Sequence, residues 1–386
     1  MQLKTNHGNV KLPAFFPDAT CGFVRGIDSI DLENTKTDGL VVNVYHLLKH
    51  GLINVISDSR KFGDIHKFMN WKDPVISDSG GFQVFSLIRE NPKLGNITDQ
   101  GVLFQLDNEK IFLTPEECIQ IQIKLGSDIV MCLDDCTAAG ELITEQKESV
   151  RRTIEWAKRC KNEFNRLTNS TKSKSKNKNK PNKNKPLIFG IIQGGENKQL
   201  RKYCAQELLK IGFNGYAFGG WPVKEHKDKN GKNKTKFLRN ILKFTSDQIP
   251  DNYPKYAMGV GQPEDIIECI KVGYNLFDCV LPTRNARHRS LYIWKKDIRK
   301  IKILKSKIKN INKLYETIDI DRGKYKEDKN PISQFCDCYT CKNYSRAYLR
   351  NVFMRKDSLA VRLATIHNLR FYAQLFENLR KENNIK

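Results

Sequence analysis

The sequence predicts an α/β protein in which eight parallel strands and their helices close into a (β/α)8 barrel. Short apolar runs alternate with longer amphipathic runs along most of the 386 residues, which is typical of parallel strands joined by crossover helices. Eight such units in roughly 250–300 residues fit a barrel better than an open doubly wound sheet. Polar residues stand at the ends of the apolar runs, where a barrel places its active face.

Seven of the apolar runs are predicted strands. They cover residues 40–45, 74–78, 128–134, 187–193, 215–220 and 255–260, and the run that contains Asp278 and breaks at Pro282. Thr114-Pro115-Glu116-Glu117 is a capping box that opens a helix ending at Gly126, and Gln262-Pro263 opens a helix ending at Gly273. The polar residues at the strand ends are Asp78, Asp134, Gln193, Gly219, Gly220, Gly261 and Asp278. His46 is expected to be a core histidine with satisfied hydrogen bonds.

The charge balance favours a polyanionic partner. The formal net charge is +24 and the pI is about 9.5, which points to nucleic acid first and to an anionic membrane surface second. No run is long enough to span a bilayer, and the N-terminus lacks the apolar core of a signal peptide. Most of the eleven cysteines are scattered singly, as reduced cysteines are, so we expect a cytoplasmic protein without membrane contact.

Three lysine-rich segments interrupt the alternating pattern. Residues 169–185 contain no apolar side chain and are expected to be disordered, and residues 226–236 are a shorter segment of the same kind. Either segment would add weak, salt-sensitive affinity for RNA or would be a tolerant surface loop. Residues 295–313 interleave lysines with isoleucine and leucine, which predicts an ordered basic element that faces a partner.

The stretch around Asp278 combines a carboxylate inside an apolar run with a basic segment beyond Pro282. A carboxylate at the end of a core strand is costly unless a partner or a task holds it there. The predicted basic loop after Pro282 carries Arg284, Arg287, His288 and Arg289, and such arginines can hold phosphates by bidentate contacts. The residues alone leave two readings open: a nucleophile beside a phosphate clamp, which suggests chemistry on a nucleotide sugar, or an Asp278–Arg284 ion pair.

A metal site is predicted near the C-terminus. Cys336, Cys338 and Cys341 form a C-x-C-x2-C motif, and His367 follows in a helical pattern. Three thiolates and one imidazole complete a four-coordinate zinc ion and leave no open position, so the site would be structural, with one zinc ion per chain. The alternative is a chance cluster of cysteines with His367 packed in a helix face.

Taken together, these motifs resemble those of the tRNA-guanine transglycosylases of the bacterial type. The matching segments are 77–85 (SDSGGFQVF), 134–137 (DDCT), 190–195 (GIIQGG), 216–220 (YAFGG), 258–261 (MGVG), the Asp278 stretch and the cysteine cluster. The resemblance implies a barrel core over residues 1–290 that carries the Lys/Asn-rich insertion at about 169–185. It further implies a zinc-binding subdomain with C-terminal helices that complete the barrel over 291–386, and a homodimer.

The resemblance also implies roles for single residues. Asp278 would attack the ribose C1′ as nucleophile, and Asp78 would act as general acid/base. Asp134, Gln193 and the N–H of Gly220 would read the purine edge. The other implied base-binding residues are Phe82, Met258, Ser79 and Trp221, and Asn43 and Gln83 would lie near the nucleophile and the ribose. The implied RNA-binding residues are Gly259, Val260, Gly261, Gln262, Pro263, Thr283, Arg284, Asn285, Ala286 and Arg287.

The implied reaction replaces guanine at wobble position 34 of the Asp, Asn, His and Tyr tRNAs, which have GUN anticodons. Val223 and Cys136 match the bacterial type, so the incoming base is expected to be preQ1, although Trp221, Pro222 and Lys224 depart from the usual pocket sequence. A queuine-inserting enzyme and a non-catalytic RNA-binding subunit are the alternatives. A zinc-dependent hydrolase would need an open metal position at the strand ends.

Overall fold

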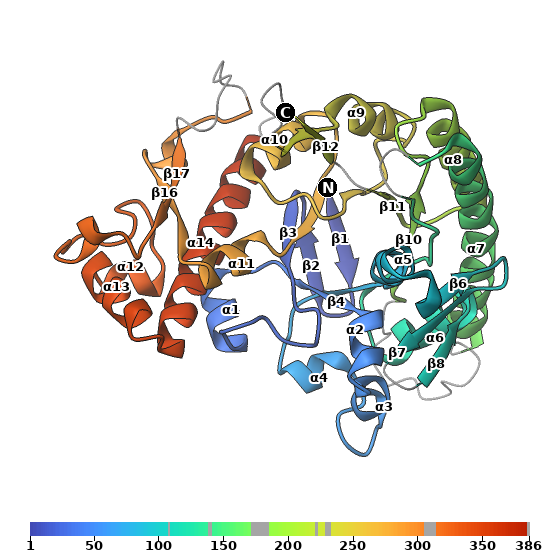
Figure 1. Ribbon diagram of the computed structural model, residues 1–386, viewed down its shortest axis with the longest axis horizontal. Coiled ribbons are helices and arrows are strands. Elements are labelled where there is room, and N and C mark those ends of the chain that lie inside the picture. The colour runs from blue at the N-terminus through green and yellow to red at the C-terminus, as the bar shows by residue number, and fades with distance from the viewer. Residues whose placement is uncertain are drawn as a thin grey trace.

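The computed structural model describes residues 1–106, 109–137, 141–170, 185–220, 223–227, 233–304 and 314–383. Its centre is an eight-stranded parallel sheet with strand order β3-β15-β14-β11-β10-β9-β5-β4 (Figure 1). The strands are β3 (Ala14–Pro17), β4 (Leu40–Asn43), β5 (Val75–Asp78), β9 (Ile129–Met131), β10 (Leu187–Ile192), β11 (Gly215–Phe218), β14 (Lys255–Ala257) and β15 (Leu276–Cys279). This arrangement confirms the predicted (β/α)8 class.

The two end strands of the sheet meet and close the barrel. Asp18, just beyond β3, forms a parallel bridge with Val41 of β4, and the Ala19 N–H donates to the Val41 carbonyl at 2.8 Å. Strand β3 is the one strand of the barrel that the sequence pattern did not predict. Its four residues, Ala-Phe-Phe-Pro, are all buried and too few to give a pattern. Some strands are shorter than predicted. The strand predicted over 128–134, for example, covers only Ile129–Met131, because the residues after it belong to a loop at the barrel rim.

Helices surround the barrel as expected. They are α1 (Ser29–Thr35), α2 (Val44–Lys49), α3 (Leu52–Ser57), α4 (Ile65–Met69), α5 (Gly81–Glu90), α6 (Pro115–Lys124), α7 (Ile143–Ser170), α8 (Lys198–Ile211), α9 (Arg239–Asp247), α10 (Pro263–Lys271) and α11 (Leu281–Arg287). The capping box of α6 is confirmed, with reciprocal bonds between Thr114 and Glu117 at 3.0 and 3.1 Å. The basic loop expected after Pro282 is wrong: Pro282 lies in the first turn of α11, where a proline costs no hydrogen bond.

Two further corrections concern segments with strands that the sequence did not predict. Strands β12 (Val223–Lys227) and β13 (Asn233–Phe237) form an antiparallel hairpin, so the expected disorder of 226–236 is wrong for its described residues. At the base of the hairpin Val223 pairs with Phe237, so the hairpin begins and ends with an apolar residue. A second antiparallel sheet contains β6 (Gly95–Ile97), β7 (Val102–Leu106) and β8 (Glu109–Leu113). Of the predicted 169–185 insertion, residues 169–170 end α7 and 171–184 lie outside the described residues.

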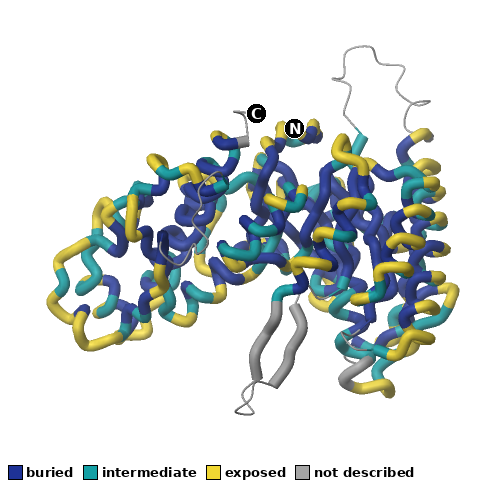
Figure 2. Tube along the Cα trace, turned by 90° about the horizontal axis from the view of Figure 1, so that it is seen from above, coloured by how far each residue is buried: buried dark blue, intermediate teal, exposed yellow. Residues whose placement is uncertain are grey.

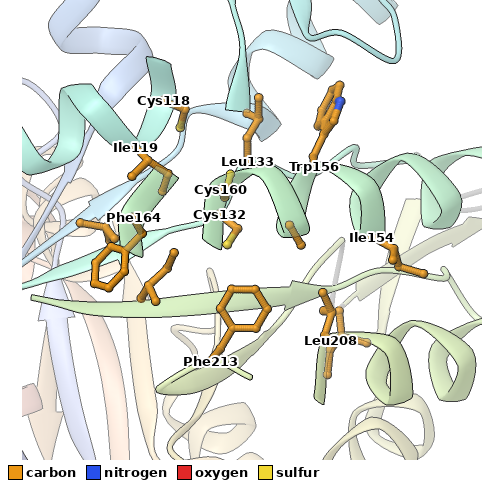
Figure 3. Close-up of a cluster of buried hydrophobic side chains, with 14 of the residues drawn as sticks. Cys118, Ile119, Cys132, Leu133, Ile154, Trp156, Cys160, Phe164, Leu208 and Phe213 are labelled. Carbon is orange, nitrogen blue, oxygen red and sulfur yellow. The ribbon is translucent and has the colours of Figure 1, made fainter. Parts of the chain in front are cut away.

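Apolar side chains fill the barrel and the layer outside it. The hairpin of β1 (Gln2–Thr5) and β2 (Gly8–Lys11) contributes Leu3 and Val10 to the cluster that contains the barrel interior. Figure 2 shows buried residues concentrated in the barrel strands and exposed residues on the outer helices. Cys118, Cys132 and Cys160 pack in the outer cluster (Figure 3), and none of the eleven cysteines, all of them in the described ranges, is in a disulfide. No described helix has the length and apolar character that a membrane span requires.

The C-terminal part lies beside the barrel and is joined to it by one long helix. It contains β16 (Ser290–Trp294), β17 (Tyr315–Asp319), α12 (Tyr339–Asn343), α13 (Arg346–Met354) and α14 (Ser358–Asn383). Helix α14 runs between these elements and the barrel (Figure 1). The Tyr372 hydroxyl donates to the Gly261 carbonyl at 2.6 Å, and the Asn368 amide donates to the Pro282 carbonyl at 3.0 Å. The helix therefore holds the loop after β14 and the first turn of α11. The described ends of the predicted basic element 295–313 include a short 3-10 turn at Ile298–Lys300, and 305–313 lie outside the described residues.

A buried carboxylate ties the N-terminal hairpin to the bottom of the barrel. Asp128 accepts hydrogen bonds from the His7 N–H at 3.1 Å, the His7 ring at 3.0 Å and the Val75 N–H at 3.0 Å, and it lies 3.2 Å from the His66 ring. Burial alone would raise the pKa of Asp128, but the hydrogen bonds from His66, His7 and Val75 outweigh it and hold that pKa well below its usual range.

We expect Asp128→Asn to lower the free energy of unfolding by about 2–4 kcal/mol at neutral pH, because three donors lose their ionised acceptor. A depressed pKa gives stability that is present above the ordinary value of 3.8 and is lost as the pH falls through the folded-state value. The wild-type protein should therefore lose more stability than the variant when the pH is lowered below 4. Urea unfolding over this pH range tests this, with the exposed Glu145→Gln as control; equal pH dependence of wild type and Asp128→Asn would contradict it.

Candidate active site and metal centre

Three carboxylates meet at the carboxyl ends of the barrel strands. Asp78 is the last residue of β5, Asp134 follows β9 and Asp278 lies in β15. Burial, followed by the negative charges of Asp134 and Asp278, raises the pKa of Asp78 to about 7. Asp78 is thus close enough to both other carboxylates for their charges to affect it, as the strand-end pattern predicted.

The turn after β5 is built to hold Asp78. The Asn43 amide donates to Asp78 Oδ2 at 2.5 Å and to Gln83 Oε1 at 3.0 Å, and the backbone N–H groups of Ser79 and Gly80 also bond to Asp78. Gly80 has φ +81°, and a Cβ at this position would lie 2.7 Å from Tyr45 Cβ. Only glycine fits this turn without strain, and the turn aims the carboxylate into the barrel mouth.

Asp278 is held by neighbours on β14 and in the loop that follows it. Its Oδ1 accepts from the Gly259 N–H at 2.8 Å, and the Tyr256 side chain also bonds to it. Burial raises the pKa of Asp278 to about 6, although both hydrogen bonds oppose this rise. In the described part of the chain no ion pair joins Asp278 to Arg284, so the alternative of a strand-end salt bridge is wrong.

Asp134 and Gln193 form a buried polar pair next to these two carboxylates. The Gln193 amide donates to Asp134 Oδ2 at 2.6 Å. Gln193 is 1% exposed and Asp134 is 8% exposed. Burial raises the pKa of Asp134 to about 7 against the effect of this hydrogen bond. A Cβ on Gly219 would lie 2.5 Å from Gln193 Nε2, so glycine is required for the close approach of the β11 loop. The pair presents one carboxylate and one amide to the barrel mouth.

Arg201 supports this pocket from below, and the sequence reasoning missed it. Its side chain is 1% exposed and donates to the carbonyls of Ile192 at 2.6 Å, Gly195 at 2.9 Å and Gly219 at 2.9 Å. It therefore joins the loops after β10 and β11. The available signal was helical spacing, because Arg201 shares its face of α8 with Cys204, Ala205 and Leu208, which are all buried.

The other predicted base-contacting residues are only partly gathered. Ser79 is buried, and Phe82 and Met258 are half-buried, with Met258 packed against the barrel interior. Trp221 lies outside the described residues. His46 is half-buried, and its ring nitrogens bond to no described residue, so the expectation of a satisfied core histidine is wrong.

The predicted RNA-binding residues divide by exposure. Gly259, Gln262 and Arg284 are exposed, Asn285 and Arg287 are half-buried, and Val260, Gly261, Pro263, Thr283 and Ala286 are buried. The Asn285 amide donates to the Tyr292 hydroxyl at 2.8 Å, and the Thr283 hydroxyl donates to the Val280 carbonyl at 3.0 Å. The exposed members lie on the loop after β14 and on α11. Strand β14 pairs with β15, the strand that carries Asp278, and α11 follows β15 in the chain.

The predicted metal ligands are brought together by α12 and α14. The ligand atoms of Cys336, Cys338, Cys341 and His367 all lie within 4.8 Å of one another, so the cluster can hold a metal ion. His367 Nδ1 lies 3.2 Å from Cys341 Sγ and 3.7 Å from Cys338 Sγ. His367 Nε2 lies 2.6 Å from the Tyr292 carbonyl, which fixes the proton on Nε2 and leaves the Nδ1 lone pair for the metal. With four donors present, no coordination position is left open.

A (β/α)8 barrel with carboxylates at the carboxyl ends of its strands is the arrangement of an enzyme, and the closed cysteine–histidine centre lies in the part of the chain beside that barrel. The chain belongs to the queuine tRNA-ribosyltransferase family, whose model matches residues 1–384. It is 40% identical over 374 residues to a queuine tRNA-ribosyltransferase of Mannheimia succiniciproducens, covering 96% of this chain and 86% of that protein. It is 41% identical over 381 residues to the protein of the same name from Shewanella sediminis, covering 98% and 88%.

Cys338→Ala should abolish metal retention, because a three-donor site with an open position binds a metal far more weakly than a closed one. Metal analysis after dialysis against a weak chelator should give about one ion per chain for the wild type and near zero for the variant, together with a lower Tm. Cys204→Ala, which removes a buried thiol outside the cluster, is the control and should keep its metal. An unchanged metal content in Cys338→Ala would rule out this ligand set.

Proposed function

We propose that this chain exchanges guanine at wobble position 34 of tRNAs with GUN anticodons, those for Asp, Asn, His and Tyr, for the queuosine precursor preQ1. Asp278 is the nucleophile and Asp78 the general acid/base. The observation that carries the proposal is the meeting of these carboxylates at the barrel mouth, where Asn43 donates to Asp78 and the Gly259 N–H donates to Asp278. Burial raises the pKa of Asp278 to about 6 and that of Asp78 to about 7. At neutral pH the first group is mostly ionised and can attack, whereas the second can both give and accept a proton.

The exchange proceeds as two displacements at the ribose C1′. In the first, an oxygen of Asp278 bonds to C1′, the bond from C1′ to the guanine nitrogen breaks, and Asp78 gives a proton to the departing base. In the second, Asp78 takes a proton from the incoming base, its nitrogen bonds to C1′, and the bond from C1′ to Asp278 breaks. Two inversions retain the configuration of the ribose, as in retaining glycosidases. The RNA chain stays intact throughout.

The buried pair of Asp134 and Gln193 supports recognition of a guanine-like edge. The Asp134 carboxylate would accept from the ring N1–H and the exocyclic amine, a donor pair that adenine lacks. The Gln193 amide and the Gly220 N–H would donate to O6, and Phe82 and Met258 would pack on the faces of the ring. A base in this pocket must be turned out of the anticodon stack. Arg284 is exposed and would hold the phosphates of the opened loop.

The choice of preQ1 rests on two positions of the sequence, Cys136 and Val223. Cys136 is buried, and the charge of Asp134 contributes to raising the pKa of its thiol, so Cys136 lies near the base-reading carboxylate. Val223 begins β12, and both residues match the bacterial type of the family. Queuine is the competing substrate because the relatives carry its name. Trapping the covalent RNA adduct and asking which of the two bases releases it distinguishes them.

The donor set of the closed centre supports zinc as its metal, with one ion per chain and a structural role. Zn2+ favours four-coordinate sites of cysteine and histidine, and such sites contribute to folding. Bound zinc would hold α12 against α14 and would take no part in the exchange. The family resemblance adds a homodimer to the proposal.

Asp278→Asn should slow base exchange by more than about 1000-fold, because the amide cannot form the covalent bond to C1′. Labelled guanine exchange and denaturing gels for the RNA adduct measure the two effects, while tRNA binding should stay within about twofold of wild type. The control is Asp99→Asn, an exposed carboxylate that pairs with Arg151. Exchange near the wild-type rate in Asp278→Asn would overturn the nucleophile assignment.

Guanine affinity should fall as the pH drops below 7. Free Asp134 has a pKa of about 7, and two N–H donors from the base favour its ionised form and lower that pKa in the complex. Affinity is therefore complete above pH 7 and falls by about tenfold per pH unit below it, until the pKa of the complex is reached. Calorimetric titration should show this slope in the wild type and in Asp78→Asn but not in Asp134→Asn. A slope that persists in Asp134→Asn would contradict the assignment.

A further inference from the structure

Three side chains that can ligate a metal lie together around α2, outside both sites described above. They are Cys21, His46 and His50, and the sulfur of Cys21 and one ring nitrogen of each histidine all lie within 4.8 Å of one another. Cys21 and His46 are half-buried and His50 is exposed, so an ion in solution can reach all three. We propose that Cys21, His46 and His50 form a second metal site, suited to a thiophilic divalent cation such as Zn2+.

The backbone presents these donors together. His46 and His50 are one helical turn apart, with the His50 N–H donating to the His46 carbonyl at 3.1 Å, so both side chains leave the same face of α2. The loop that carries Cys21 runs beside β4, because the Ala19 N–H donates to the Val41 carbonyl and the Asn43 N–H donates to the Thr20 carbonyl at 3.2 Å. The contacts that close the barrel thus bring Cys21 to the helix.

The three donors are free to bind an ion. Within the described part of the chain, neither the Cys21 thiol nor the ring nitrogens of His46 and His50 hydrogen-bond to another residue, and His46 makes only an edge contact with the Tyr45 ring. The cluster of His7, His66 and Asp128 differs, since Asp128 already accepts from the His7 ring at 3.0 Å and lies 3.2 Å from the His66 ring at the bottom of the barrel. In the described part of the chain, the cluster of Cys21, His46 and His50 therefore has three donor groups that no hydrogen bond engages.

The donor set predicts the properties of the site. One thiolate and two imidazoles suit Zn2+, and a tetrahedral ion places its donors about 3.3–3.8 Å apart, which small rotations of these half-exposed side chains can reach. Three protein donors leave a fourth position open to water or an anion. The positive charges of Arg25 and Lys49 act on the Cys21 thiol and will weaken the binding of a cation. The site should therefore bind more weakly than the closed Cys3His centre.

The position of the site gives it a link to the carboxylates of the rim. The Asn43 side chain caps α2 by accepting from the His46 N–H at 3.3 Å, and the same side chain donates to Asp78 at 2.5 Å. An ion held by His46 and His50 would restrain α2 and the Cys21 loop at this point. The proposal itself concerns binding and does not depend on the reaction assigned to the chain.

Cobalt titration tests the proposal on the full-length protein with its tightly bound metal in place. Co2+ added to the wild type should produce a thiolate-to-cobalt charge-transfer band that saturates at about one added equivalent. Cys21→Ala should lack the band, and His50→Ala should bind Co2+ at least about tenfold more weakly, because each variant loses one of three donors. His288→Ala, which removes an exposed histidine at the end of α11, is the matched control and should bind like the wild type.

Three outcomes would overturn the proposal. The first is no band in the wild type, and the second is a band of full size in Cys21→Ala, which would place the cobalt on the Cys3His centre. The third is an affinity in His50→Ala equal to that of wild type. Because Cys21 and His50 lie at the surface of the fold, circular dichroism should show both variants to be folded, so a lost signal reports on the site.

Discussion

The burial of three carboxylates in one barrel mouth is the constraint on which this structure depends. Asp78, Asp134 and Asp278 are drawn together by parallel strands, and burial raises the pKa of each. Such an arrangement is costly, and it persists only because neighbours fixed by the barrel donate to it. Asn43 holds Asp78, Gln193 holds Asp134, and Gly259 with Tyr256 holds Asp278.

These holding groups depend in turn on contacts outside the mouth. Arg201 fixes the loops beside Gln193 through three carbonyls, and the glycines at 80 and 219 allow backbone to approach where a side chain would not fit. The closure of β3 against β4 sets the position of Asn43. The chemistry proposed for the rim therefore rests on packing around the whole barrel rather than on three residues.

Local patterns in the sequence were sufficient to predict most of the barrel strands and the cysteine–histidine cluster. Apolar runs with a carboxylate at their ends predicted the strands that carry the rim, and the cysteine spacing predicted a cluster that the fold assembles. Features that depend on distant contacts could not be predicted in this way. Strand β3 is too short to show a hydrophobic period, and the β12–β13 hairpin lies in a lysine-rich segment that resembles a loop. Arg201 is buried although arginine is a charged residue type that is expected at the surface. Cys21 and His46 meet only because the barrel closes.

Helix α14 connects the metal centre to the mouth of the barrel. Within two turns, the helix carries His367 of the centre, Asn368 on the Pro282 carbonyl and Tyr372 on the Gly261 carbonyl. The loop anchored by Tyr372 also contains Gly259, whose N–H steadies Asp278. A metal ion held by His367 and the three cysteines would therefore stabilise, through α14, the loop whose N–H bonds to Asp278, and removing that ion should loosen the loop.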